Sequence, residues 1–184
     1  TQYLRQWHTR LWTRSQFSTI WKVDYVTNNL AECLNSWIKP HKSMNLDDLM
    51  DKIRQMIMRK WNQRRKISKK FDGIILPHII KDLNEKNREL NFEVEECSED
   101  VAEVTVMGGS AFRFVVNLQD MTCSCRKWQV SGIPCKHALA FITSLSDSPL
   151  QNYVDLYYLV EKFRLAYSQP IPAMPDKSQW PKST

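Results

Sequence analysis

Four side chains that bind soft metal ions lie close together in the second half of the chain. They form two pairs, Cys123-Ser-Cys125 and Cys135-Lys-His137, with nine residues between the pairs. Residues i and i+2 of an extended backbone project to the same side, about 6.7 Å apart. Their side chains can lean inward until two sulfurs are within about 4 Å, as two Zn–S bonds of about 2.3 Å require. We therefore predict that Cys123, Cys125, Cys135 and His137 bind one zinc ion.

Three thiolates and one imidazole would complete a tetrahedral shell with no open position, which is typical of a structural site rather than a hydrolytic one. Two alternatives exist: the cysteines could fill an apolar core while His137 caps a helix, or one cysteine could form a catalytic pair with His137. Three of the five cysteines fall within thirteen residues, which indicates metal binding in a reducing compartment rather than disulfides. Of the other two, we expect Cys33 to be buried on a helix and Cys97 to be a free thiol.

Helical periodicity dominates the chain before residue 91. Apolar residues repeat from Leu30 to Ile38, and Pro40 ends that run. A second helix is expected from about Asn45, and a third after Pro77. The predicted buried stripe of the second helix is Leu46, Leu49, Met50, Ile53, Ile57 and Trp61.

The period changes to two from Phe92 onward, which predicts β-structure. A β-hairpin is expected from the strand-like segments 101–107 and 112–118, with Gly108-Gly109 supplying the positive φ of the turn. This hairpin would lead directly into the cysteine cluster. A short helix is predicted at Ala138–Leu145 and an aromatic-rich helix at Tyr153–Tyr167.

The predicted fold class is therefore α+β, with helices first and a β-plus-metal module after them. We expect a helical region at 1–90, a β-hairpin and finger region at 91–167 with the finger at about 112–145, and a Pro-rich tail at 168–184. No run of about 18 apolar residues occurs, so no membrane-spanning segment is predicted.

The charge distribution favours polyanionic partners. The chain carries 26 basic and 20 acidic side chains, a net charge of +6, with a pI near 9.1. Six acidic residues and no basic one occupy 93–103, a stretch that would repel DNA. A basic run could contact DNA phosphates, although it could equally be a solvated helix end whose cations suit the helix dipole. The run comprises Arg59, Lys60, Arg64, Arg65, Lys66, Lys69 and Lys70.

Two segments together resemble a known family. The stretch Cys123 to His137, with Trp128 and Gly132-Ile133-Pro134 between the ligand pairs, resembles the SWIM-type zinc finger of plant Mutator-like element transposases and their domesticated relatives. The segment 26–38, VTNNLAECLNSWI, is similar to the TNN-x-x-E-x-x-N block upstream of that finger. The resemblance covers nearly the whole chain.

The resemblance implies an RNase H-like transposase core that uses three carboxylates and Mg²⁺, followed by the finger. Glu32 matches the position of the third carboxylate, while Asp24 matches neither of the other two. Glu32 could instead be the N3 partner of an Asn29 N-cap. We expect the chain to be a C-terminal piece of such a protein, which is not competent alone because it lacks two carboxylates; the intact parent would be nuclear and bind Mg²⁺.

Three functions remain open from the sequence. The first is the C-terminal part of a Mutator-like DNA transposase, binding DNA. The second is a domesticated, non-enzymatic zinc-finger regulator that binds DNA or protein partners. The third is a zinc-stabilised protein-interaction module with no role on nucleic acid.

Overall fold

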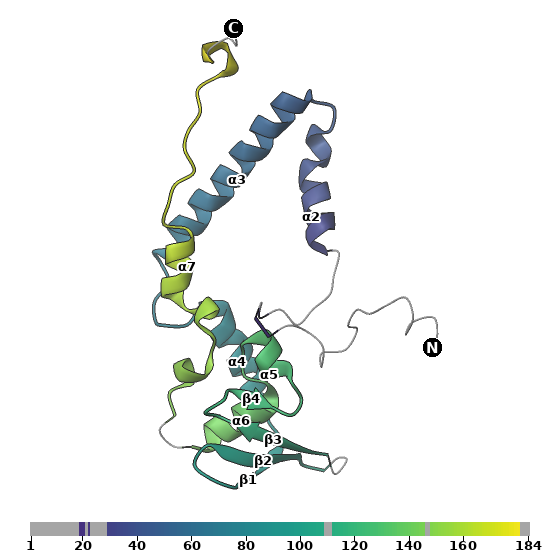
Figure 1. The fold of residues 1–184 in the computed structure, drawn as a ribbon, viewed down its shortest axis with the longest axis vertical. Helices are drawn as coiled ribbons and strands as arrows, with labels where there is room; N and C mark the ends of the chain where they lie inside the picture. The colour runs from purple at the N-terminus through teal and green to yellow at the C-terminus, as the bar shows by residue number, and fades with distance from the viewer. Residues whose placement is uncertain (1–18, 21, 23–28, 109–111, 146–147, 181–184) are drawn as a thin grey trace, which may run out of the picture. The chain divides into compact units, whose positions relative to one another are not determined.

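A computed structural model of the chain describes residues 19–20, 22, 29–108, 112–145 and 148–180 (Figure 1). Asp24, the first residues of the 26–38 block and Gly109 of the predicted turn lie outside the described residues. No helix in the described part combines the length and the apolar character needed to cross a membrane.

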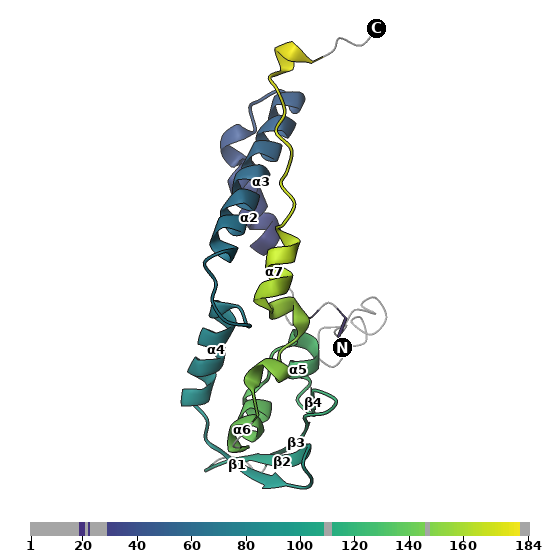
Figure 2. The same cartoon turned by 90° about the vertical axis from the view of Figure 1, so that its left-hand side faces the viewer.

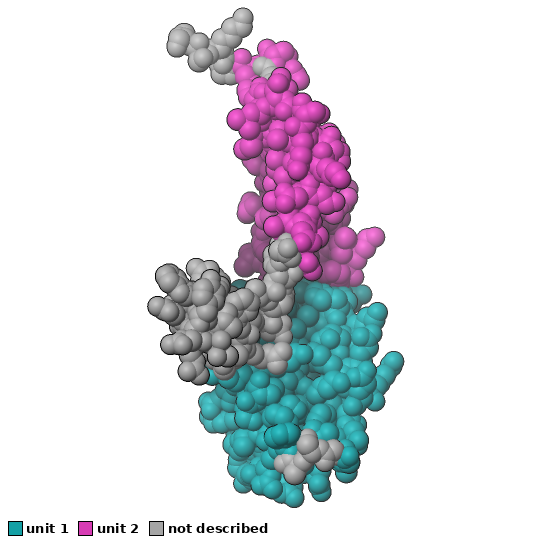
Figure 3. All heavy atoms as spheres, turned by 90° about the vertical axis from the view of Figure 1, so that its right-hand side faces the viewer, with its two compact units in different colours: residues 1–26, 72–160 teal, residues 27–71, 161–184 magenta. Residues whose placement is uncertain are grey.

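The chain divides into two compact units (Figure 3). Unit 1 comprises Thr1–Val26 and Asp72–Val160, and unit 2 comprises Thr27–Phe71 and Glu161–Thr184. Each unit therefore contains segments from distant parts of the sequence. The domain boundary expected near residue 91 stays a prediction.

Unit 1 is built on a four-stranded antiparallel sheet with the strand order β1-β2-β3-β4. The sheet is larger than the predicted hairpin because two more strands join it, one at each edge. The strands are β1 (Phe92–Glu96), β2 (Val101–Val106), β3 (Arg113–Asn117) and β4 (Thr122–Cys123). Together with the helices, this sheet confirms the predicted α+β class.

The core of unit 1 lies between one face of the sheet and helix α6 (Lys136–Ser144), as Figures 1 and 2 show. α6 contacts all four strands, and α4 (Pro77–Arg88) packs against α6. Alternation along the strands turns Val104 and Val116 inward, where both are fully buried with Phe141. The third predicted helix and the one at Ala138–Leu145 correspond to α4 and α6.

The aromatic segment after α6 differs from its prediction. The single helix expected at Tyr153–Tyr167 is wrong, because the segment contains the 3₁₀ turns η3 (Leu150–Tyr153) and η4 (Leu156–Tyr158) and the short helix α7 (Val160–Ala166). Leu159 forms a β-bridge with Ile75, and the Tyr158 carbonyl accepts a hydrogen bond from the Leu76 N–H at 2.9 Å. This pairing holds the backbone extended where a helix would need it coiled.

Unit 2 contains α2 (Asn29–Ile38), η2 (Lys39–His41), α3 (Leu46–Ser68), most of α7 and η5 (Lys177–Gln179). α7 lies against the end of α3, where Arg164 donates hydrogen bonds to the carbonyls of Ser68 and Phe71 at 3.1 and 2.7 Å. The Trp61 indole N–H donates to the Gln169 carbonyl at 2.7 Å. The first two predicted helices correspond to α2 and α3.

The predicted burial on α2 and α3 is partly wrong. Cys33 is exposed, and Leu46, Met50 and Ile57 of the expected buried stripe are 76%, 60% and 41% exposed. Only Met56 and Ser68 of α3 are buried. Leu49, Ile53 and Trp61 of the same stripe are half-buried. Periodicity identified the apolar side of the helix, but burial of that side requires a neighbour, and the described residues cover it only in part.

Candidate metal centre

The first pair of predicted ligands is positioned by a tight turn between β3 and β4. The Asn117 side-chain oxygen accepts a hydrogen bond from the Asp120 N–H at 2.9 Å, and Met121 adopts a positive φ of 51°. The turn pairs Val116 with Cys123, so the Cys123 side chain points inward, where it is 1% exposed. Cys125 follows two residues later, before a left-handed residue, Arg126 (φ 61°).

A short connecting helix that periodicity did not predict, α5 (Lys127–Ser131), carries the chain from the first pair toward the second. Gly132 ends it with a φ of 71°, and the Gly132 N–H donates to the Trp128 carbonyl at 2.7 Å. Trp128 is 1% exposed and donates its indole N–H to the Tyr153 carbonyl at 3.0 Å. Trp128 therefore packs in the core behind the cluster and is not exposed to a partner.

The second pair lies at the start of α6. Cys135 is the N-cap residue, and its sulfur accepts a hydrogen bond from the Ala138 N–H at 3.4 Å. His137 lies in the first turn, so the alternative in which His137 caps the helix is wrong. The positive end of the helix dipole would stabilise the Cys135 thiolate that a bound metal ion requires.

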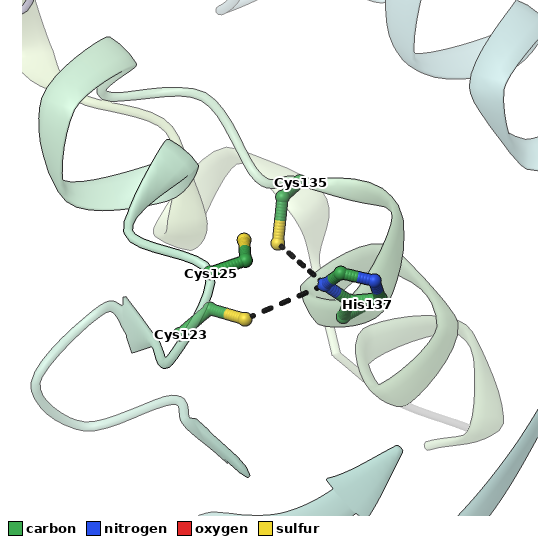
Figure 4. A group of neighbouring side chains, drawn as sticks. All are labelled: Cys123, Cys125, Cys135 and His137. Atoms are coloured by element: carbon green, nitrogen blue, oxygen red, sulfur yellow. Dashed lines mark hydrogen bonds between the residues drawn. The ribbon is translucent and has the colours of Figure 1, made fainter. Parts of the chain in front are cut away.

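The four predicted ligands converge on one point (Figure 4). Their ligand atoms all lie within 4.8 Å of one another. The Nδ1 atom of His137 is 3.6 Å from the Cys123 sulfur and 3.9 Å from the Cys135 sulfur. A tetrahedral zinc with Zn–S of about 2.3 Å and Zn–N of about 2.0 Å needs separations of about 3.5–3.8 Å. The donor set and its spacing therefore fit zinc with small movements of the side chains.

The three thiols are coupled to one another. Hydrogen bonds to Cys125 and Cys135, and then burial, raise the pKa of Cys123. Hydrogen bonds from Cys123 and Cys135 lower the pKa of Cys125. The hydrogen bond to Cys123 lowers the pKa of Cys135, but the hydrogen bond to Cys125 and burial outweigh it and raise that pKa to about 11. By themselves the thiols favour one thiolate, at Cys125, held by two thiol donors.

Two aromatic residues that the sequence did not single out hold the imidazole. Phe114 stacks on the His137 ring with centroids 3.7 Å apart and planes 12° apart, and Phe92 meets the ring edge-on at 5.3 Å. At the first ligand pair, the Gln129 side-chain amide donates a hydrogen bond to the Cys123 backbone carbonyl at 3.0 Å. The alternation in the strands indicated that both phenylalanines face inward, but their contact with His137 depends on how the sheet meets α6.

The other predicted site residues lie outside this cluster. Glu32 is exposed in the first turn of α2, which begins at Asn29. The capping box between Asn29 and Glu32 stays a prediction. The basic run lies on the last half of α3 and just after it, with Arg65 half-buried and the other members exposed. Within the described ranges, the only group of three or more His, Cys, Asp or Glu side chains with metal-binding spacing is the cluster above.

Comparison with known protein families matches residues 114–145 to the SWIM zinc finger. The matched segment contains all of β3 except Arg113, together with β4, α5, α6 and all four cluster residues. Neither the curated proteins nor the solved structures give a match to this chain. Residues 114–145 are therefore similar to a SWIM zinc finger, and their Cys/His cluster could hold a metal ion.

Proposed function

We propose that the cluster holds one structural zinc ion and that the finger is part of the C-terminal region of a Mutator-like transposase that binds DNA in the nucleus. The single observation that carries the zinc proposal is the convergence of Cys123, Cys125, Cys135 and His137 within 4.8 Å. Four protein ligands fill a tetrahedral shell, so the ion would have a structural role.

Zinc would add a direct cross-link between two parts of the finger that α5 joins along the chain. Cys123 and Cys125 hold the β4 end, while Cys135 and His137 hold the start of α6. When bound, the ion supplies positive charge that keeps the three sulfurs as thiolates. The protein supplies the orientation: Phe114 fixes the imidazole plane, and the Ala138 N–H fixes the Cys135 sulfur.

DNA binding is supported by the net charge of +6 and by the basic run on α3. Backbone phosphates tolerate a spread of cations on more than one face of a helix, because phosphate contacts carry little sequence information. Each neutralised phosphate releases counterions, so the affinity of such a surface must fall as salt rises.

The test is duplex binding by fluorescence anisotropy over a salt series. We expect the variant Arg59→Gln, Lys60→Gln, Lys66→Gln, Lys69→Gln to bind more weakly, with a salt slope smaller by about 0.9 for each phosphate that the variant no longer neutralises. The matched control removes four exposed charges elsewhere: Lys42→Gln, Lys81→Gln, Arg88→Gln, Lys162→Gln. Equal weakening in both variants would contradict a phosphate-binding role for the basic run, and an absence of wild-type binding at low salt would contradict DNA binding itself.

Glu32 is proposed as the third carboxylate of the transposase site, on its match to the family block. Two-metal phosphodiester chemistry needs converging acids around a pair of Mg²⁺ ions about 3.5–4 Å apart. In the intact transposase we expect Glu32→Gln to abolish strand transfer and leave the zinc content unchanged. Wild-type transposition by that variant would leave Glu32 with a helix-capping role only.

A further inference from the structure

A groove of about 370 Å³ opens beside the metal cluster within unit 1. Its apolar wall is made by the inward-facing ends of the strands, by the residue that precedes β3 and by the imidazole. The wall residues are Phe92, Val106, Phe112, Phe114 and His137.

One aromatic side chain in this wall is exposed far more than packing requires. Phe112 is 69% exposed, whereas Phe114 next to it stacks on His137 at 3.7 Å. Phe112 lines the groove together with Phe92, Val106 and Phe114, and a contiguous apolar surface of this kind is typical of a ligand-binding groove. A ring with an open π-face suits a nucleobase, because every base can stack on it.

Three lysines line the same groove: Lys86, Lys127 and Lys136. Lys136 forms an ion pair with Glu89 at 2.6 Å, and Lys86 pairs with Asp82, so both are partly neutralised. In the part of the chain that the structure describes, Lys127 has no ion-pair partner. One free cation beside an open ring matches the single phosphate charge of one nucleotide.

Three of the four acidic residues of the sheet lie on its opposite side, and the fourth, Glu96, lies at the end of β1 away from Phe92. Phe92 and Val94 of β1 pack toward α6, so the alternating Glu93 and Glu95 point away from the groove. Glu103 of β2 points to that same outer side, where it pairs with Arg113 at 2.9 Å. The groove is therefore separated from the acidic stretch that would repel a nucleic acid.

We propose that this groove binds one nucleotide of a single-stranded nucleic acid, with the base stacked on Phe112 and the neighbouring phosphate on Lys127. The proposal rests on the proposed function, nucleic-acid binding, and adds the form of nucleic acid and the residues that hold it. An acidic peptide is the less suitable occupant, because a carboxylate side chain has no π-face to stack on the exposed ring of Phe112.

The test uses the zinc-loaded chain and fluorescein-labelled (dT)12, with binding measured by anisotropy. Base stacking on one ring predicts that Phe112→Leu weakens binding about tenfold, while Phe112→Trp retains it, because leucine keeps an apolar surface but no π-face. The control Tyr157→Leu, at a similarly exposed ring (66%), is expected to stay within twofold of wild type. Lys127→Gln is expected to weaken binding several-fold, and Lys81→Gln, with the same charge change, far less.

The outcomes separate this proposal from the one on which it rests. If Phe112→Leu binds (dT)12 as the wild type does while duplex binding remains salt-dependent, the stacking groove is wrong and the DNA-binding function stands. If the wild type binds neither single-stranded nor duplex DNA, both proposals fail. Binding of a poly-glutamate peptide in place of (dT)12, abolished in Phe112→Leu, would overturn the nucleotide assignment. Zinc content measured on each variant shows that the fold is intact.

Discussion

At the scale of single residues, Cys135 has two roles in the finger. Its sulfur is one of the four converging ligand atoms, and it also accepts the Ala138 N–H at 3.4 Å as the N-cap of α6. Loss of this side chain would remove a metal ligand and leave the first turn of the helix uncapped. The finger is therefore more sensitive at Cys135 than an ordinary buried cysteine would be.

We predict that Cys135→Ala lowers zinc affinity by at least about 100-fold and unfolds the region from about 110 to 145, because zinc binding and folding are coupled. Circular dichroism and a zinc assay measure both effects, and the helices α2 and α3 should keep much of their signal. Cys97→Ala is the control, since Cys97 is exposed and outside the cluster. A Cys135→Ala protein with full zinc content would contradict the ligand assignment.

Zinc binding should also depend on pH. The raised pKa values of Cys123 and Cys135 keep these two thiols protonated near neutral pH, whereas the lowered pKa of Cys125 favours its thiolate. The zinc-bound form carries fewer protons, so affinity rises with pH and declines as pH falls. Competition with a chromophoric chelator should give a slope of about 2 in log affinity per pH unit between about pH 7 and 8.5. A flat profile would contradict thiol deprotonation on binding.

The ligands could be predicted from the sequence because their chemistry is local. A C-x-C pair and a C-x-H pair bring donors together within each pair whatever the fold. The stacking of Phe114 on His137 could not be predicted, because it depends on the register of β3 and on the packing of α6 over the sheet. The alternation in β3 predicted only that the Phe114 ring faces the core.

At the scale of elements, Gly132 is the residue that lets α5 stop before the second ligand pair. Its φ is 71°, and a Cβ added there would lie 2.8 Å from the Asp155 Cβ. Gly132→Ala is therefore expected to lower the free energy of unfolding by about 1–3 kcal/mol and to weaken zinc binding. Denaturant unfolding in the presence of zinc measures the first effect.

Gly73→Ala is the matched control for this substitution. Gly73 also has a positive φ, 84°, but a Cβ there meets nothing within 4 Å. Gly73→Ala should lower the free energy of unfolding only by the backbone strain of a positive φ, about 1 kcal/mol, and should leave zinc affinity unchanged. Equal decreases in the free energy of unfolding for the two variants would show that the contact between the added Cβ at residue 132 and the Asp155 Cβ does not destabilise the fold.

The elements that the sequence predicted well have a long, regular period. α3 and α4 have that pattern, and β2 and β3 alternate clearly. α5 was missed because it has five residues between two left-handed ones, too short for a period to show. The segment 153–167 was predicted as one helix because its apolar residues suit a helix, yet its pairing with Ile75 is a long-range contact that propensity does not contain.

For the whole molecule, the sequence predicted the α+β class but not which apolar surfaces are covered. The stripe of α3 is regular, and Leu46 and Met50 are nonetheless exposed. The β-structure, in contrast, is buried as its alternation predicts, because α6 supplies the neighbour within the same segment. Burial follows from the pattern only where the covering element is close in the sequence.

The most direct test of the central claim is X-ray absorption at the zinc edge of the purified chain, together with its zinc content. One zinc per chain is expected, with three sulfur neighbours at about 2.3 Å and one nitrogen at about 2.0 Å. A first shell dominated by oxygen, four sulfurs, or a zinc content far below one per chain would contradict the closed shell of Cys123, Cys125, Cys135 and His137.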